Sequence, residues 1–140
     1  MRATFPLLAL ALLTPHLHAD DWPQFRGEHR DAVWNEAGIM QTFPAEGLKI
    51  TWRAAVGNGL SSPVIAKGRV YLVDSELKKP KARENVRCLD EKTGQPVWTF
   101  TYDATYPDWA FAPDQKAGPN STPIVHGGKI YSVGQMGDLL

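Results

Sequence analysis

The residues of this sequence best suited to binding chemistry lie in one segment, residues 103–120. The segment brings aromatic rings and carboxylates close together: Tyr106, Asp108, Trp109, Phe111 and Asp114. The indole of Trp109 could stack on a flat cofactor, and the carboxylates of Asp108 and Asp114 could meet a cation. In the alternative interpretation, Trp109 and Phe111 cover the edge of a sheet. Trp109, Asp108 and Asp114 are therefore the candidates for cofactor binding, with both interpretations open.

The other residues capable of chemistry favour structural roles. Asp90 and Glu91 form an acidic pair without a convergent third ligand nearby, which favours a turn acceptor over a metal or acid–base site. Cys88 alternates with Asp90 in the pattern of a strand, and a nucleophilic cysteine would need a histidine partner and an activating site. We predict a small buried residue at Cys88, and we assign no catalytic residue and no metal ligand.

The composition is typical of a globular protein rich in short strands. The 140 residues carry 15 Lys and Arg against 15 Asp and Glu, and this neutrality argues against a nucleic-acid binder. Twelve Gly and eleven Pro favour strands and turns over a helical bundle. A single cysteine excludes an intrachain disulfide, a Cys-x-x-Cys redox pair and a Cys-x-x-Cys-His haem attachment motif.

The first residues have the pattern of a secretory signal peptide. Arg2 provides a positive charge, residues 7–13 form an unbroken apolar run, and Ala19 is placed where a signal peptidase would cut before Asp20. The run is much shorter than the ~20 apolar residues that span a bilayer, and no later stretch is long enough. A lipid anchor would need a cysteine directly after the cut. The sequence thus predicts a periplasmic or secreted protein with no membrane span and no lipid anchor.

An internal repeat indicates how the chain is organised. Residues 61–73 align without a gap with residues 121–133, and both copies have a Pro, a Gly and a Tyr at matching positions. Each copy predicts a hairpin, with a tight turn at the Gly between two short apolar runs. Such a repeat is typical of architectures built from one recurring supersecondary unit.

A second, weaker sequence similarity extends this unit. The Trp-bearing segments 50–53 and 96–99 each precede one copy of the repeat, so each predicts a further strand. The basic residues 78–83 predict a solvated hairpin insertion between the second and third strands, in preference to a docking patch. The expected unit is close to a four-stranded propeller blade. Its strands lie after Pro63, after Gly68, around residues 86–90 and around residues 96–102.

The turn between the third and fourth strands carries the most specific motif: Asp90, Thr93, Gly94 and Trp98. Asp90 can accept hydrogen bonds from backbone amides across the turn, and the hydroxyl of Thr93 can do the same. Gly94 permits a left-handed backbone. Trp98 follows at a distance that lets its ring leave the strand and pack on a neighbouring sheet. These four residues predict a structural repeat motif.

This motif resembles the tryptophan-docking repeat of the pyrroloquinoline-quinone (PQQ)-like β-propellers. Residues 21–27 and 59–63 are similar to the corresponding segments of exported bacterial PQQ-binding-like repeat proteins. The resemblance covers about residues 21–140. It implies an all-β fold, a partial β-propeller of four-stranded antiparallel blades with about one and a half blades present.

We expect three regions along the chain. Residues 1–19 are the signal peptide, residues 20–47 an N-terminal extended segment, and residues 48–140 an incomplete propeller domain. By the resemblance, the strand around residues 50–56 would complete the last blade and close the ring. Residues 137–140 look like the start of the third strand of the next blade. The sequence is therefore expected to be the N-terminal part of a longer protein.

The resemblance leaves two function classes. The first is a noncatalytic platform that binds or scaffolds a protein or a polysaccharide, similar to the propeller subunit of outer-membrane β-barrel assembly. The second is a quinoprotein dehydrogenase that oxidises alcohols or sugars with PQQ and calcium, which the resemblance would place on the face of residues 103–120. The blade in this sequence lacks the adjacent cysteine pair and the Glu and Asn ligand set of such enzymes. We favour the platform and assign no cofactor.

Overall fold

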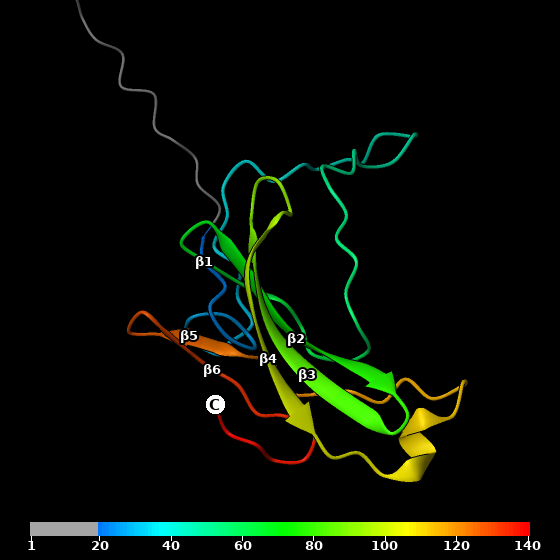
Figure 1. The fold of residues 1–140 in the computed structure, drawn as a ribbon. Coiled ribbons are helices and arrows are strands. Elements are labelled where there is room, and N and C mark those ends of the chain that lie inside the picture. The colour runs from blue at the N-terminus through cyan, green and yellow to red at the C-terminus, as the bar shows by residue number, and fades with distance from the viewer. Residues whose placement is uncertain (1–19) are drawn as a thin grey trace, which may run out of the picture.

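The computed structural model describes residues 20–140, so the predicted signal peptide and the cleavage residue Ala19 lie outside the described residues. The described chain is mostly β, with a four-stranded antiparallel sheet and a two-stranded sheet (Figure 1). The larger sheet contains, in chain order, β1 (Val64–Ala66), β2 (Arg69–Lys78), β3 (Lys81–Asp90) and β4 (Pro96–Ala104). The smaller sheet contains β5 (Ile124–His126) and β6 (Lys129–Tyr131). Residues 20–140 contain no α-helix; a 3₁₀ helix, η1, spans Asp108–Phe111.

The two copies of the sequence repeat form the same hairpin, as predicted. Val64 pairs with Tyr71 in the first copy, and Ile124 pairs with Tyr131 in the second. Two consecutive residues of each turn have a positive φ, which suits the twist of the flanking strands. These turn residues are Lys67 and Gly68 in the first hairpin and Gly127 and Gly128 in the second.

The β2–β3 hairpin is longer than the sequence indicated. The two strands pair from Arg69 opposite Asp90 to Lys78 opposite Lys81. The basic residues 78–83 are the exposed tip of this hairpin, in agreement with the predicted solvated hairpin insertion. Side chains alternate along a strand, so the basic side chains point to solvent while Ala82 between them is buried.

The four-stranded sheet has an apolar face and a polar face. Residues directly opposite one another across antiparallel strands share a face. The register of β2, β3 and β4 places on the apolar face Tyr71, Val73, Val86, Cys88, Trp98 and Phe100. The same register places on the polar face Asp74, Glu76, Asn85, Arg87, Thr99 and Thr101. The apolar face contains the deeply buried carboxylate of Glu84, and the polar face contains that of Asp74.

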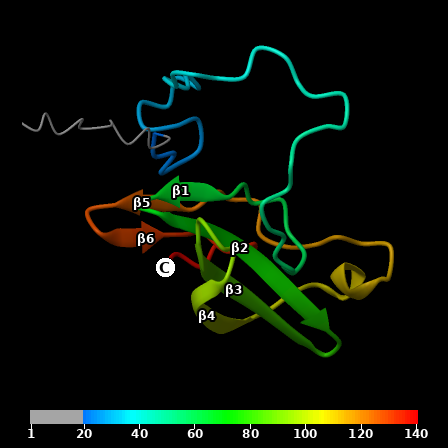
Figure 2. The same ribbon diagram turned by 90° about the horizontal axis from the view of Figure 1, so that it is seen from above.

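The start of the described chain joins the two hairpins. The backbone of Trp22 and that of Ile65 exchange two hydrogen bonds of 2.8 and 3.0 Å, and the N–H of Val125 donates to the carbonyl of Pro23 (2.8 Å). The chain therefore enters between β1 and β5. Figure 2 shows that the residues that follow arch away from the sheets before returning to β1.

The segment 50–56 is not the strand that the sequence predicted. It belongs to no strand of the described chain, and the nearest pairing is an isolated bridge between Asn58 and Ser75. A strand exists only where a partner supplies the other half of its hydrogen-bond ladder. The prediction rested on a partner from another blade, and residues 20–140 place no such partner beside this segment.

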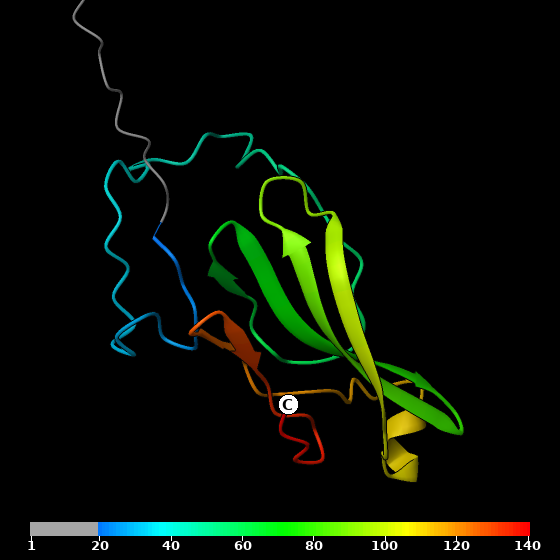
Figure 3. The same ribbon diagram turned by 60° about the vertical axis from the view of Figure 1, so that its left-hand side comes forward.

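The last residues form an isolated β-bridge beyond β6, at the place where the repeat predicts a third strand. Ser132 and Leu140 exchange two backbone hydrogen bonds of 3.2 and 3.0 Å, and Val133 bridges Leu139 in the antiparallel sense. Figure 3 shows this C-terminal hairpin next to the twisted four-stranded sheet. The second repeat thus follows the strand order of the first as far as the chain extends.

Candidate functional site

One carboxylate organises the turn between β3 and β4. Asp90 Oδ1 accepts hydrogen bonds from the N–H of Lys92 (3.2 Å), the N–H of Thr93 (3.1 Å) and the hydroxyl of Thr93 (3.0 Å). Asp90 Oδ2 forms an ion pair with Arg69 Nη1 at 2.9 Å. The Thr93 hydroxyl above all, and then the backbone donors, hold the pKa of Asp90 below its ordinary value. Asp90 is thus a turn acceptor, as the sequence predicted.

A tryptophan from a distant part of the chain docks on this turn. The indole N–H of Trp52 donates to the backbone carbonyl of Glu91 (2.8 Å). Gly94 lies directly against the indole, since a Cβ at this position would be 2.4 Å from Trp52 Cε3. Gly94 also has a left-handed backbone, with φ 69°. Glycine is therefore required here both for the turn and for the approach of the ring.

A Gly94→Ala variant is expected to lower the free energy of unfolding by about 2 kcal/mol, because the left-handed backbone disfavours a Cβ and Trp52 must move. Chemical denaturation followed by tryptophan fluorescence measures this loss. Gly38→Ala is the matched control, because Gly38 also has a positive φ but a Cβ there would meet nothing within 4 Å. Equal losses in the two variants would show that the contact with Trp52 contributes nothing.

Trp98 lies on the apolar face of β4 and is 40% exposed. Its ring centroid is 6.2 Å from that of Tyr71, with the two ring planes inclined at 47°. Cys88 pairs with both residues in the sheet register and is buried, as predicted. Burial raises the pKa of the Cys88 thiol, which keeps it protonated and unreactive at neutral pH. Trp98 contacts its own sheet, and part of its ring remains uncovered in the described chain.

The three candidates for cofactor binding lie on the surface at the far end of the β2–β3 hairpin. Trp109 is on η1 and is 59% exposed. Asp108 forms an exposed ion pair with Lys79 (3.1 Å), and Asp114 accepts a hydrogen bond from Gln115 (3.4 Å). Within the described residues, no group of three His, Cys, Asp or Glu side chains is arranged to hold a metal ion. Trp109 is thus accessible for stacking, without a converging set of carboxylates.

Glu84 is fully buried in the apolar face and joins several segments. Its Oε1 accepts hydrogen bonds from the Tyr106 hydroxyl (2.6 Å) and the Gln135 N–H (3.0 Å), and its Oε2 accepts one from the Tyr102 hydroxyl. Burial, and then the neighbouring carboxylate, raise the pKa of both tyrosines, so both hydroxyls remain donors. One carboxylate therefore holds together β3, β4, the segment after β4 and the chain after β6.

Asp74 is the buried carboxylate of the polar face. Its Oδ2 accepts hydrogen bonds from Arg87 Nε (2.5 Å) and the Gly57 N–H (2.8 Å), and its Oδ1 accepts one from Asn85 (2.7 Å). Asn85 in turn accepts a hydrogen bond from the Thr101 hydroxyl (2.7 Å). The pKa of Arg87 is raised, mainly because its side chain donates a hydrogen bond to Asp74. This network ties the chain before β1 to the sheet.

Comparisons of the chain with protein-family models, with curated proteins and with solved structures find no match. Within residues 20–140, no helix is long and apolar enough to cross a membrane. The features that bear on function are the docked turn, the two buried carboxylates and the exposed side chains of Asp108, Trp109 and Asp114.

Sequence reasoning missed both buried carboxylates and the contact between Trp52 and Gly94. A signal for Glu84 was present, because it stands at an inward-facing position of β3 between Ala82 and Val86. A carboxylate at such a position is buried only when several donors converge on it. Those donors come from residues far along the chain, so their convergence becomes evident only in the folded structure.

Proposed function

We propose that this chain forms part of an exported, noncatalytic β-propeller that acts as a binding or scaffolding platform. The observation that carries the proposal is the docking of Trp52 on the turn between β3 and β4. Trp52 reaches this turn from a segment outside the four-stranded sheet, and a contact of this kind would join neighbouring blades. Trp98 occupies the matching position of β4, with part of its ring free for the same contact.

The direction in which the apolar face points supports blade stacking. Glu84, on this face, accepts a hydrogen bond from the N–H of Gln135, which follows β6. The apolar face of the first sheet is therefore turned towards the second repeat. Phe100 lies beside Trp98 on the same face and is also exposed. Face-to-face packing with a completed second sheet would bury both rings, as repeat architectures require.

The use of the buried polar groups supports a platform over an enzyme. Glu84 and Asp74 each accept hydrogen bonds from three donors of the chain itself, so their role is to fix the sheet and its neighbours. Cys88 is a buried, protonated thiol. A rigid, exported sheet assembly without charge excess suits a protein or polysaccharide partner, and nucleic acid is disfavoured by the neutral composition.

The second candidate is a dehydrogenase that uses PQQ and calcium, and exposed Trp109 is the observation that favours it. Calcium takes 6–8 oxygen ligands. The segment 103–120 offers Asp108, already paired with Lys79, and Asp114, with no third carboxylate converging on them among the described residues. One accessible ring and two separate carboxylates do not make up a calcium and quinone site. The residues of this segment therefore do not fit these cofactors by themselves.

Titration calorimetry of the full-length protein with PQQ and calcium tests the proposal. We expect no saturable binding, and no reduction of an artificial electron acceptor in the presence of alcohols or sugars, because the required ligands do not converge on Trp109. Trp109→Ala serves as the control variant. Saturable micromolar binding of PQQ that disappears in Trp109→Ala would overturn the platform proposal and favour the dehydrogenase.

A further inference from the structure

Strand β4 forms an uncovered edge of the four-stranded sheet. It pairs only with β3, and within the described chain no isolated bridge or other backbone hydrogen bond involves residues 97–103. Figure 3 shows β4 as the outermost strand of the sheet. A long exposed edge presents a row of unpaired N–H and C=O groups, so it is a template for pairing with a further strand.

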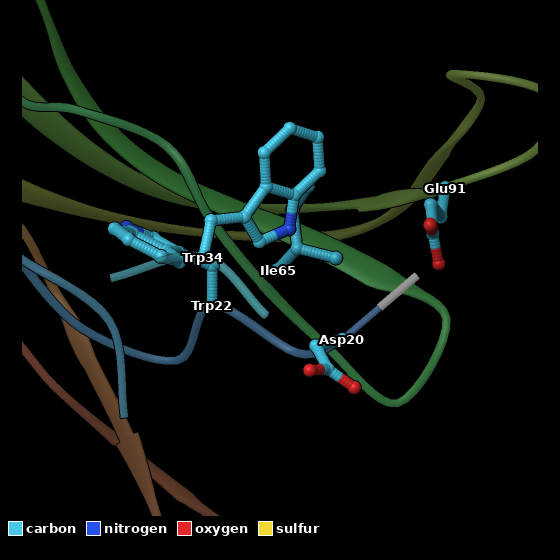
Figure 4. Close-up of a pocket in the computed structure, with 5 residues that line it drawn as sticks. All are labelled: Asp20, Trp22, Trp34, Ile65 and Glu91. Atoms are coloured by element: carbon cyan, nitrogen blue, oxygen red, sulfur yellow. The ribbon is translucent and has the colours of Figure 1, made fainter. Parts of the chain in front are cut away.

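The opposite edge of the sheet is covered. Ile65 of β1 exchanges two backbone hydrogen bonds with Trp22, near the start of the described chain. Figure 4 shows the Trp22 indole standing over Ile65, in a pocket of about 340 Å³ that Trp34 also lines. Beyond the end of β1, Ser75 of β2 exchanges two backbone hydrogen bonds with Asn58. Strand β4 is therefore the edge of this sheet that is left to pair.

The hydrogen-bond pattern identifies which backbone groups of β4 point outward. Antiparallel pairs alternate between hydrogen-bonded and non-hydrogen-bonded. The backbone of Ser75 bonds outward to Asn58, so its pair with Glu84 in the β2–β3 ladder is non-hydrogen-bonded. The backbone of Glu84 therefore bonds to that of Tyr102 in β4. The alternate residues of β4 carry the outward N–H and C=O groups, and these residues are Thr99, Thr101 and Asp103.

The composition of this edge favours pairing. Residues 98–102 alternate aromatic residues with Thr, all strong strand formers, and contain no charge, Gly or Pro. Thr99 and Thr101 are exposed. The carboxylate of Asp103, which follows, is already paired with Arg83 (3.3 Å). The middle of the edge thus lacks the charges and prolines with which natural proteins block such pairing.

We propose that β4 pairs antiparallel with β4 of a second copy of this chain, so that two four-stranded sheets become one continuous sheet. The alternation of aromatic residues and Thr reads the same in both directions, so an antiparallel copy keeps rings beside rings and Thr beside Thr. A two-fold contact uses the same edge on both copies and leaves neither edge free. All the residues involved belong to the first sheet, so the pairing does not depend on the propeller proposed above.

One register pairs all the outward groups of both copies. In this register Thr101 lies opposite Thr101 of the second copy, and Thr99 lies opposite Asp103 of the second copy. Phe100 then stands beside Tyr102 of the second copy on the apolar face. Aromatic pairs and Thr–Thr pairs across antiparallel strands are stabilising, and the two Asp103 carboxylates are not opposite each other.

Sedimentation velocity of the full-length protein over a range of concentrations tests the proposal, and we expect a monomer–dimer equilibrium. Thr99→Pro should weaken dimerisation about tenfold or more, because proline cannot donate a hydrogen bond to the new ladder. Thr99→Ala is the matched control, since it changes the same exposed side chain and keeps the N–H. Both variants retain the β3–β4 ladder, because the backbone groups of Thr99 point outward.

A second pair of variants at the same position tests the register. Thr99→Lys places a cation opposite Asp103 of the second copy, and Thr99→Asp places a second carboxylate there. We expect Thr99→Lys to dimerise about fivefold more tightly than Thr99→Asp, because opposite charges across strands stabilise and like charges destabilise. Adding Asp103→Asn to each variant should remove this difference. Equal dimerisation of Thr99→Lys and Thr99→Asp would overturn the proposed pairing.

Three further results would also overturn the proposal. The first is a protein that stays monomeric up to about 0.1 mM, which is weaker than a specific contact of this kind. The second is dimerisation that is unchanged in Thr99→Pro, which would indicate contact between apolar faces, because Thr99 lies on the polar face. The third is equal weakening in Thr99→Pro and Thr99→Ala. Circular dichroism checks folding, and Asp103→Pro, with Asp103→Ala as its control, replaces Thr99→Pro if that variant unfolds.

Discussion

A Trp98→Ala variant of the full-length protein is expected to lose about 3–5 kcal/mol of unfolding free energy, the usual range for truncating a buried tryptophan. Within the described chain the ring is partly exposed and lies against Tyr71. In the proposed propeller its remaining surface would be buried on the turn of a further blade, as Trp52 is on Gly94. Equilibrium denaturation in guanidinium chloride measures the loss.

The matched control for this prediction is Trp109→Ala, which removes a more exposed ring from η1. Surface substitutions of this kind usually change stability by about 0.5 kcal/mol or less. If Trp98 only contacts Tyr71, its removal should cost roughly 1 kcal/mol, the order of a single aromatic pair. A loss of that size for Trp98→Ala would contradict docking on another blade.

Replacing Glu84 by alanine is expected to lower the free energy of unfolding by about 3 kcal/mol, because each buried polar group left unsatisfied costs about 1–3 kcal/mol. The variant leaves the hydroxyls of Tyr102 and Tyr106 and the N–H of Gln135 without their acceptor. Thermal and chemical denaturation measure the loss. Amide hydrogen exchange at Gln135 should also accelerate, because this N–H loses its acceptor.

Two variants distinguish the buried network from a general effect of losing a carboxylate. Glu76→Ala removes an exposed carboxylate two strand positions from Asp74, and surface ion pairs are worth only about 0–1 kcal/mol. Glu84→Gln retains an acceptor for some of the donors and should lose less stability than Glu84→Ala. Equal losses in Glu84→Ala and Glu76→Ala would mean that Glu84 does not join the segments in solution.

The hairpins were predictable because their determinants are local. Positive-φ turn residues and alternating apolar positions within 61–73 and 121–133 specify two short strands and the turn between them. The length of β2 and β3 was not predictable in the same way. Basic residues 78–83 indicate a solvated hairpin insertion, but only the pairing of the two strands decides how far the ladder extends towards its tip.

The turn of the candidate site was also predictable, because its determinants are local, whereas its contact with a distant residue was not. Asp90 binds donors at positions two and three residues further along, so the Asp90, Thr93 and Gly94 pattern alone predicts the turn. The second requirement on Gly94, contact with Trp52, involves a residue about forty positions away. No local pattern around Gly94 carries that information.

The sequence by itself determined a mostly β chain, the chain order of the strands from β1 to β4, the two equivalent hairpins and the Asp90 turn. Each of these depends on residues close together in the chain, where side-chain period and turn chemistry restrict the backbone directly. Tertiary structure alone decided that Trp52 docks on Gly94, that Tyr102, Tyr106 and Gln135 converge on Glu84, and that a pocket forms at Trp22. The physical reason is that a buried carboxylate or a docked ring is stable only when several distant segments supply its partners together.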